Sequence, residues 1–136
     1  MRDKDLLLGI DIGTTGTKCS VYDFRGIRVA SAYREYPMIH PRPGWTEQDP
    51  YRWWDTVCCN LQTIFKSQNI DKNRIAAVGT SSTNAVVLVD RQGQPVCNAI
   101  SLHDQRSGHQ VEWLKENIGE ERIRGVAANR IANGSF

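Results

Sequence analysis

The chain has 136 residues, of which 40% are hydrophobic and 24% charged, and its formal net charge is +2 at pH 7. This length can bury a hydrophobic core and predicts one domain. Lysine and arginine are scattered among the acidic residues, which argues against a nucleic-acid-binding surface. The apolar run 6–10 ends at Asp11 and is too short for a membrane span or a signal-peptide core. A cytoplasmic protein without membrane contact is therefore expected.

The first third of the chain is predicted to form a meander of three antiparallel strands. Residues 6–10 predict a strand that is buried on both faces and ended by Asp11. A turn over 13–16, which contains two glycines, leads to a second strand over 18–23. A polar turn then leads to a third strand over 28–36.

A proline-rich loop and a helix are predicted next. Residues 37–50 contain four of the five prolines, which is typical of an irregular loop. Asp49 and Pro50 are typical of a helix start, and we expect a helix over 51–68 with one apolar face. The members of that face are Trp54, Val57, Cys58, Leu61, Ile64 and Phe65.

The rest of the chain alternates strand and helix patterns. Buried strands are predicted over 75–79 and 86–89, the sheet is expected to continue over 95–102, and the pattern is helical from 107 onward. The four cysteines have no metal-ligand spacing and are interpreted as reduced thiols that mostly pack in the core.

Residues 11–18, Asp-Ile-Gly-Thr-Thr-Gly-Thr-Lys, combine the groups that bind a metal and a phosphate. Glycines let backbone N–H groups approach an anion, the threonine hydroxyls add donors, and Asp11 can bind Mg²⁺ directly or through water. Lys18 adds a positive charge. This is not a Walker loop, because the Gly-Lys-Ser/Thr ending is missing and a strand follows the glycines. An ordinary hairpin turn accounts for the same residues equally well.

Four segments together resemble the FGGY carbohydrate kinases, and they extend over nearly the whole chain in the family's order and spacing. Residues 9–18 resemble the first phosphate-binding hairpin, and 41–50 resemble the Pro-Gly-Trp loop with its Glu-x-Asp-Pro helix start. Residues 75–79 are similar to the strand that leads to the sugar pocket, and 98–107 are similar to a segment of Asn-Asp-Gln-Arg type.

The resemblance implies an α/β fold: a ribonuclease H-like lobe of the actin and hexokinase ATPase type, with a mixed sheet and flanking helices. Residues 1–136 would form most of an N-terminal lobe, with ATP between two lobes and the sugar mainly against the first. The expected activity is transfer of the γ-phosphate of ATP, with Mg²⁺, to a hydroxyl of a small sugar or polyol.

The resemblance also implies what lies outside this chain. The family's catalytic base is an aspartate in a later motif, so no catalytic residue is expected here. We expect the chain to be inactive without its C-terminal lobe. Members of the family often form dimers, so a homodimer is a further expectation.

Site residues follow from the resemblance position by position. Asp11 is expected near Mg²⁺. Gly13, Thr14, Thr15 and Lys18 are expected near the phosphates of the nucleotide. Sugar contacts are expected from Thr83, Asn84, Asp104 and Arg106. Xylulokinases typically carry Gln-Met-His, and glycerol kinases Gln-Arg-Glu, where this chain has Thr-Asn-Ala at 83–85, so neither substrate transfers directly. A ketopentose-like substrate is the hypothesis, from similarity to the xylulokinase side of the family.

Other interpretations stay open at this point. Residues 81–84 could be an ordinary polar turn, and Arg106 could be a solvated surface charge. The whole chain could be a non-catalytic fragment that binds sugar or phosphate. It could also be a lobe of another actin-like ATPase, although the Pro-Gly-Trp and Asp-Gln-Arg segments argue against this.

Overall fold

The computed structural model describes residues 4–83 and 85–133 and divides into two compact units. The described part of the first unit comprises residues 4–37 and 50–83. That of the second comprises residues 38–49 and 85–133.

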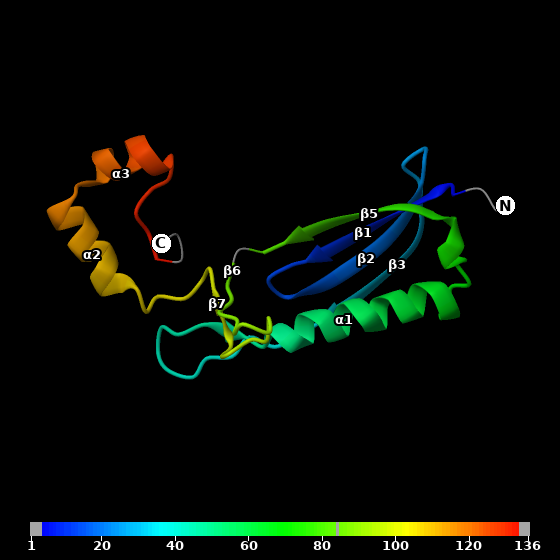
Figure 1. Cartoon of the computed structure of the whole chain (residues 1–136), viewed down its shortest axis with the longest axis horizontal. Coiled ribbons are helices and arrows are strands. Elements are labelled where there is room, and N and C mark those ends of the chain that lie inside the picture. The colour runs from blue at the N-terminus through cyan, green and yellow to red at the C-terminus, as the bar shows by residue number, and fades with distance from the viewer. Residues whose placement is uncertain (1–3, 84, 134–136) are drawn as a thin grey trace. The chain divides into compact units, whose positions relative to one another are not determined.

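The first unit is built on a four-stranded mixed sheet (Figure 1). Its strands are β1 (Leu6–Ile12), β2 (Gly16–Asp23), β3 (Arg28–Glu35) and β5 (Ile75–Ser82). The order is β3-β2-β1-β5, with β1, β2 and β3 antiparallel and β5 parallel to β1. The predicted meander of three strands is therefore confirmed.

One face of this sheet is covered by helix α1 (Pro50–Gln62), which continues as a π-helical turn over Thr63–Ser67 (Figure 1). Because successive strand residues point to opposite faces, alternate residues are buried. The core cluster consists of Leu6, Leu8, Cys19, Val21, Ala30 and Ile64. Leu7, between two core residues, is 38% exposed. The prediction that residues 6–10 are buried on both faces is wrong.

The apolar face of α1 differs from the predicted one. Trp54 is 68% exposed, whereas the polar residues Thr56 and Asn60 are buried. At 100° per residue, Trp54 lies about 120° from Asn60 around the helix axis, away from the sheet. Thr56 and Asn60 tolerate burial because both bond to Thr17 on β2: Thr56 Oγ1 donates to Thr17 Oγ1 (2.9 Å) and Asn60 Nδ2 to the Thr17 carbonyl (2.8 Å).

Strand β5 is longer and more exposed than predicted. The sequence predicted a buried strand over 75–79, but only Ile75 is half-buried and the rest of the strand is exposed. The reason is its place at the edge of the sheet, where β1 is its paired neighbour.

The second unit has a small antiparallel sheet and two helices. The strands are β4 (Glu47–Gln48), β6 (Ala85–Val86) and β7 (Ala99–Ser101), in the order β4-β7-β6. The helices are α2 (Gly108–Asn117) and α3 (Glu120–Ala127). The helical pattern from 107 is confirmed, but the predicted strand 86–89 is reduced to β6 and an isolated bridge between Val89 and Pro95. The predicted irregular loop contains β4.

The four cysteines are free thiols. Cys19 is buried, Cys58 is half-buried, and Cys59 and Cys97 are exposed, so the prediction that most of them pack in the core is wrong. In the described part of the chain, no helix is long and apolar enough to cross a membrane.

Candidate functional site

The turn between β1 and β2 is closed by its own backbone. The Gly13 N–H donates to the Gly16 carbonyl at 3.0 Å. A Cβ at Gly16 would lie 2.5 Å from the Arg34 carbonyl oxygen and 2.6 Å from the Tyr33 hydroxyl, closer than real Cβ atoms come. Only glycine therefore fits at position 16, where Gly16 is paired with Glu35 of the neighbouring strand β3.

A carboxylate, an ammonium group and a hydroxyl lie in one row across the sheet beside this turn. Asp11 on β1 is the Cα partner of Lys18 on β2 and of Ser81 on β5. Cross-strand partners project from the same face of a sheet. Both Asp11 and Lys18 are exposed. The three residues line a cavity of about 420 Å³, together with residues that include Gly9 and Gly79.

The loop after β5 is bonded to the same turn. The Thr83 N–H donates to the Ile12 carbonyl at 2.7 Å, and the hydroxyls of Thr14 and Thr83 lie 3.2 Å apart. A predicted phosphate-binding residue and a predicted sugar-binding residue are thus in contact, although 69 positions separate them in the chain. Asn84, the other residue predicted in this loop, lies outside the described residues.

Two tyrosines support the turn from the side of β3, and the sequence did not single out either of them. The Tyr36 hydroxyl donates to the Gly13 carbonyl, and the Tyr36 N–H donates to the Thr15 carbonyl at 3.2 Å. The Tyr33 hydroxyl lies 3.3 Å from Thr15 Oγ1. Burial raises the pKa of Tyr36 above its ordinary value. Its hydroxyl therefore keeps its proton at neutral pH and acts as a hydrogen-bond donor.

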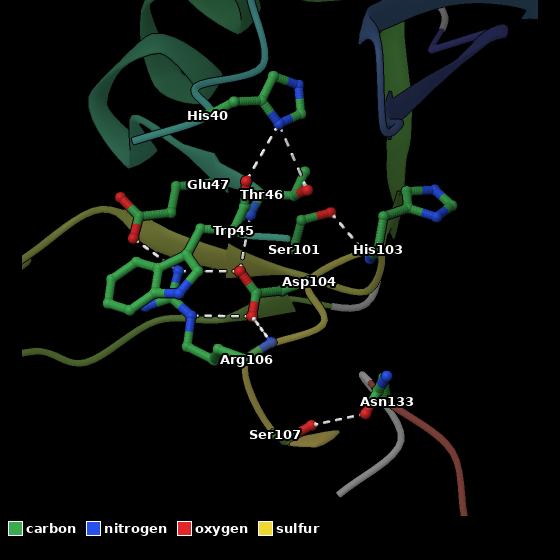
Figure 2. A network of polar contacts seen from close by, with 10 residues as sticks. All are labelled: His40, Trp45, Thr46, Glu47, Ser101, His103, Asp104, Arg106, Ser107 and Asn133. Atoms are coloured by element: carbon green, nitrogen blue, oxygen red, sulfur yellow. Dashed lines mark hydrogen bonds and ion pairs between the residues drawn. The ribbon is translucent and has the colours of Figure 1, made fainter. Parts of the chain in front are cut away.

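In the second unit, Asp104 is the centre of a network of hydrogen bonds (Figure 2). Its side chain is 3% exposed. Oδ1 accepts from the Arg106 N–H (2.9 Å) and Nε (2.8 Å), and Oδ2 accepts from the Thr46 N–H (2.7 Å) and Arg106 Nη2 (2.9 Å). Both carboxylate oxygens are therefore engaged by the protein itself.

Arg106 is fixed on its other sides as well (Figure 2). Its Nη2 donates to Glu47 Oε1 at 2.6 Å, and Glu47 Oε2 accepts from Asn98 Nδ2 at 3.0 Å. The guanidinium carbon lies 3.7 Å from the centre of the Trp45 ring, a cation–π contact. The loop that carries Trp45 is thereby in contact with Arg106.

The charges of this cluster shift one another's pKa values. Burial raises the pKa of Asp104, but hydrogen bonds from Arg106 and from the backbone of Thr46 and Arg106 outweigh burial, and the net pKa is below its ordinary value. The hydrogen bond from Arg106, followed by that from Asn98, lowers the pKa of Glu47. Hydrogen bonding to Asp104 raises the pKa of Arg106.

The predicted site residues therefore fall into two groups, one in each unit. The first group lies at or beside the β1–β2 turn and consists of Asp11, Thr14, Lys18 and Thr83. The second group lies in the second unit, where Asp104 accepts hydrogen bonds from Arg106. The signal that could have revealed this function of Asp104 is its spacing of two residues from Arg106, which allows the carboxylate to accept from both the backbone and the side chain.

The chain matches the N-terminal domain of the FGGY family of carbohydrate kinases over residues 6–134. It therefore belongs to that family.

Individual relatives agree on the family but carry different substrate names. A glycerol kinase from Haloferax volcanii is 38% identical over 117 residues, which are 85% of this chain and 23% of that protein. A crystal structure of a xylulose kinase from Rhodospirillum rubrum matches with a TM-score of 0.85 and 28% identity, covering 93% of this chain and 26% of that one. A crystal structure of a gluconate kinase from Lactobacillus acidophilus matches with a TM-score of 0.79 and 30% identity, covering 88% of this chain and 24% of that one.

These matches confirm the predicted fold class, an α/β lobe of the actin and hexokinase type with a mixed sheet and flanking helices. The chain spans about a quarter of the length of the relatives it matches.

Proposed function

We propose that this chain provides the phosphate-binding hairpin of an ATP-dependent carbohydrate kinase, which transfers the γ-phosphate of ATP to a hydroxyl of a sugar or polyol. The observation that carries the proposal is the turn over 13–16, with Asp11 and Lys18 paired beside it and Thr83 bonded to it. Membership of a family of carbohydrate kinases supports it.

Different groups of the hairpin would contribute different interactions to the binding of a phosphate. Phosphoryl transfer depends mainly on positioning and on neutralising negative charge. The hydroxyls of Thr14 and Thr15 provide hydrogen-bond donors, as do backbone N–H groups of the turn apart from that of Gly13, which donates to the Gly16 carbonyl. Lys18 provides a full positive charge on an exposed side chain next to the cavity.

The carboxylate of Asp11 is suited to bind a magnesium ion that also binds a phosphate. Mg²⁺ is usually bound through one or two carboxylates, with water and phosphate oxygens completing its shell. Asp11 is exposed at the cavity, and no group of three or more His, Cys, Asp or Glu side chains able to hold a metal occurs among the described residues. Asp11 would hold the ion, which when bound neutralises phosphate charge.

For the acceptor we propose contacts from Thr83 and Asn84 and, in the second unit, from Arg106 with Asp104 as its support. A ketopentose or a related polyol is the proposed acceptor. The base that takes the proton of the acceptor hydroxyl is proposed to lie outside residues 1–136. Asp11 is assigned to the metal, and Asp104 accepts four hydrogen bonds from the protein.

The first test is binding of the non-hydrolysable analogue AMP-PNP to this chain, measured by calorimetry with and without Mg²⁺. We expect saturable binding that needs Mg²⁺, that Asp11→Asn abolishes, and that Asp55→Asn leaves unchanged. Asp55 is a matched control, since it is an exposed carboxylate of the first unit on α1. Equal binding by both variants would refute the role of Asp11.

The second test is ADP release from Mg-ATP with a panel of pentuloses, polyols and aldonic acids. We expect no acceptor-dependent release by this chain and clear release by a longer protein that contains it. Release by the chain alone would refute the assignment of the base to residues outside it. Saturable acceptor binding without release by the longer protein would favour a non-catalytic binding protein.

A further inference from the structure

Tyr36 contacts the β1–β2 turn at two different peptide groups. Its hydroxyl donates to the carbonyl of Gly13, and its own N–H donates to the carbonyl of Thr15. The residue is 7% exposed, so the ring is fixed by packing and water has little access to the bond. One residue, 20 or more positions away in the chain, thus restrains both ends of a turn of four residues.

A bond to a carbonyl oxygen also sets the direction of the next N–H. The peptide group is planar and trans, so its C=O and N–H point in opposite directions. When the Tyr36 hydroxyl holds the Gly13 carbonyl, it fixes the direction of the Thr14 N–H on the other side of the same peptide plane. In the same way, the Tyr36 N–H fixes the peptide between Thr15 and Gly16.

The restraint matters most at Gly13, because glycine has the widest choice of backbone angles. Without a partner on its carbonyl, the peptide between Gly13 and Thr14 could rotate at little steric cost. The amides of such a turn are useful for binding an anion only while they point at it, and an ordered turn avoids an entropic cost on binding.

We propose that Tyr36 is a positioning residue for phosphate binding: its hydroxyl orients the Thr14 amide of the turn toward the phosphate. This inference rests on the proposed function of the hairpin. The species recognised is a phosphate-bearing ligand, and Tyr36 acts on it through the peptide group without touching it.

Tyr33 provides a matched comparison within the same hairpin. It also carries a hydroxyl near the turn, but that hydroxyl lies 3.3 Å from the side chain of Thr15, and the residue is 50% exposed. Tyr33→Phe therefore removes a weaker contact that orients no peptide group. Tyr36→Phe keeps the buried ring and removes only the hydroxyl.

The experiment compares the wild-type chain, Tyr36→Phe and Tyr33→Phe by two measurements. The first is the N–H residual dipolar coupling of Thr14 without ligand. The second is the affinity for magnesium pyrophosphate. We expect Tyr36→Phe to change the Thr14 coupling and to weaken affinity about fivefold, as expected for loss of one hydrogen bond. Tyr33→Phe should change affinity less than twofold.

A purely structural role for Tyr36 would give a different pattern. It would lower the urea midpoint of the first unit without changing the Thr14 coupling or the affinity of the folded chain, and that result would overturn the inference. An equal loss of affinity in both variants would also overturn it. In the unsubstituted chain, a slowly exchanging Tyr36 hydroxyl proton close to Gly13 would support the contact without any variant.

The two proposals fail in different ways. If the wild-type chain binds magnesium pyrophosphate and Tyr36→Phe binds it equally well, only the inference about Tyr36 is refuted. If the wild-type chain does not bind magnesium pyrophosphate, the phosphate-binding function of the hairpin is refuted, and the inference is refuted with it.

Discussion

Replacing Arg106 with methionine tests whether the Asp104 cluster stabilises the second unit. Methionine keeps much of the aliphatic volume of the side chain but removes the guanidinium group. Asp104 would lose its hydrogen bonds from Arg106 Nε and Nη2 and would keep those from the Thr46 and residue 106 N–H groups. Glu47 would lose its ion pair and keep the bond from Asn98.

The size of the effect follows from the burial of Asp104. Removing one partner of a buried ion pair costs about 3–5 kcal/mol, because the other charge is left without compensation. The Asp104 side chain is 3% exposed, but the Arg106 side chain is 24% exposed. Two backbone donors also remain on Asp104. We therefore expect a loss near the lower end, about 3 kcal/mol.

The assay is urea denaturation at pH 7, followed by circular dichroism, of the wild-type chain and the variant. Arg42→Met is the matched control, because Arg42 is exposed and its guanidinium carbon lies 4.9 Å from the centre of the same Trp45 ring. An exposed cation–π contact contributes about 0.5–1 kcal/mol. A loss below 1 kcal/mol for Arg106→Met, or equal losses for both variants, would refute the reasoning.

Three further predictions concern stability. The pKa values of Glu47 and Asp104 are lowered on folding. The two carboxylates therefore contribute to the unfolding free energy above their ordinary pKa values of about 4, and this contribution is lost as the pH falls through their pKa values in the folded state. The unfolding free energy measured from pH 7 to pH 2 should fall less steeply in Arg106→Met than in the wild type. Gly16→Ala should lower the unfolding free energy measured by urea denaturation by about 1–3 kcal/mol, because its Cβ meets backbone. Gly79→Ala should lower it less, because a Cβ at that position meets nothing within 4 Å. Equal losses for the two variants would contradict this. Ile64→Ala should lower stability by about 2–5 kcal/mol, and Trp54→Ala by less than 1 kcal/mol, in the same assay.

The sequence predicted the elements whose signal is local. The strands over 18–23 and 28–36 and the helix after Pro50 each carry their own turn residues or periodicity, and the structure contains all three. The hairpin over 11–18 could be found for the same reason, since its glycines, hydroxyls and charges follow one another in the chain.

Burial was harder to predict, because it depends on partners elsewhere in the chain. Asn60 is buried because the Thr17 carbonyl is there to accept its hydrogen bond, and nothing in the sequence around Asn60 indicates this partner. The apolar run of β5 resembles a buried strand, yet the strand is exposed at the edge of the sheet. The contact between Tyr36 and Gly13 is of the same kind, since 23 positions separate the two residues.

Burial and hydrogen bonding also separate the residues that can bind a ligand from those that support them. A side chain that binds a charged ligand has to reach it, and Asp11 and Lys18 are exposed beside the cavity. A side chain that orients its neighbours has to be fixed, and Tyr36 and Asp104 are buried with their polar atoms bonded. From the family resemblance, both Asp11 and Asp104 were expected to contact a ligand, Asp11 the metal and Asp104 the sugar. The surroundings of Asp11 are consistent with the metal binding that we propose for it. Asp104 instead supports Arg106, because four donors already occupy the oxygens that a sugar hydroxyl would need.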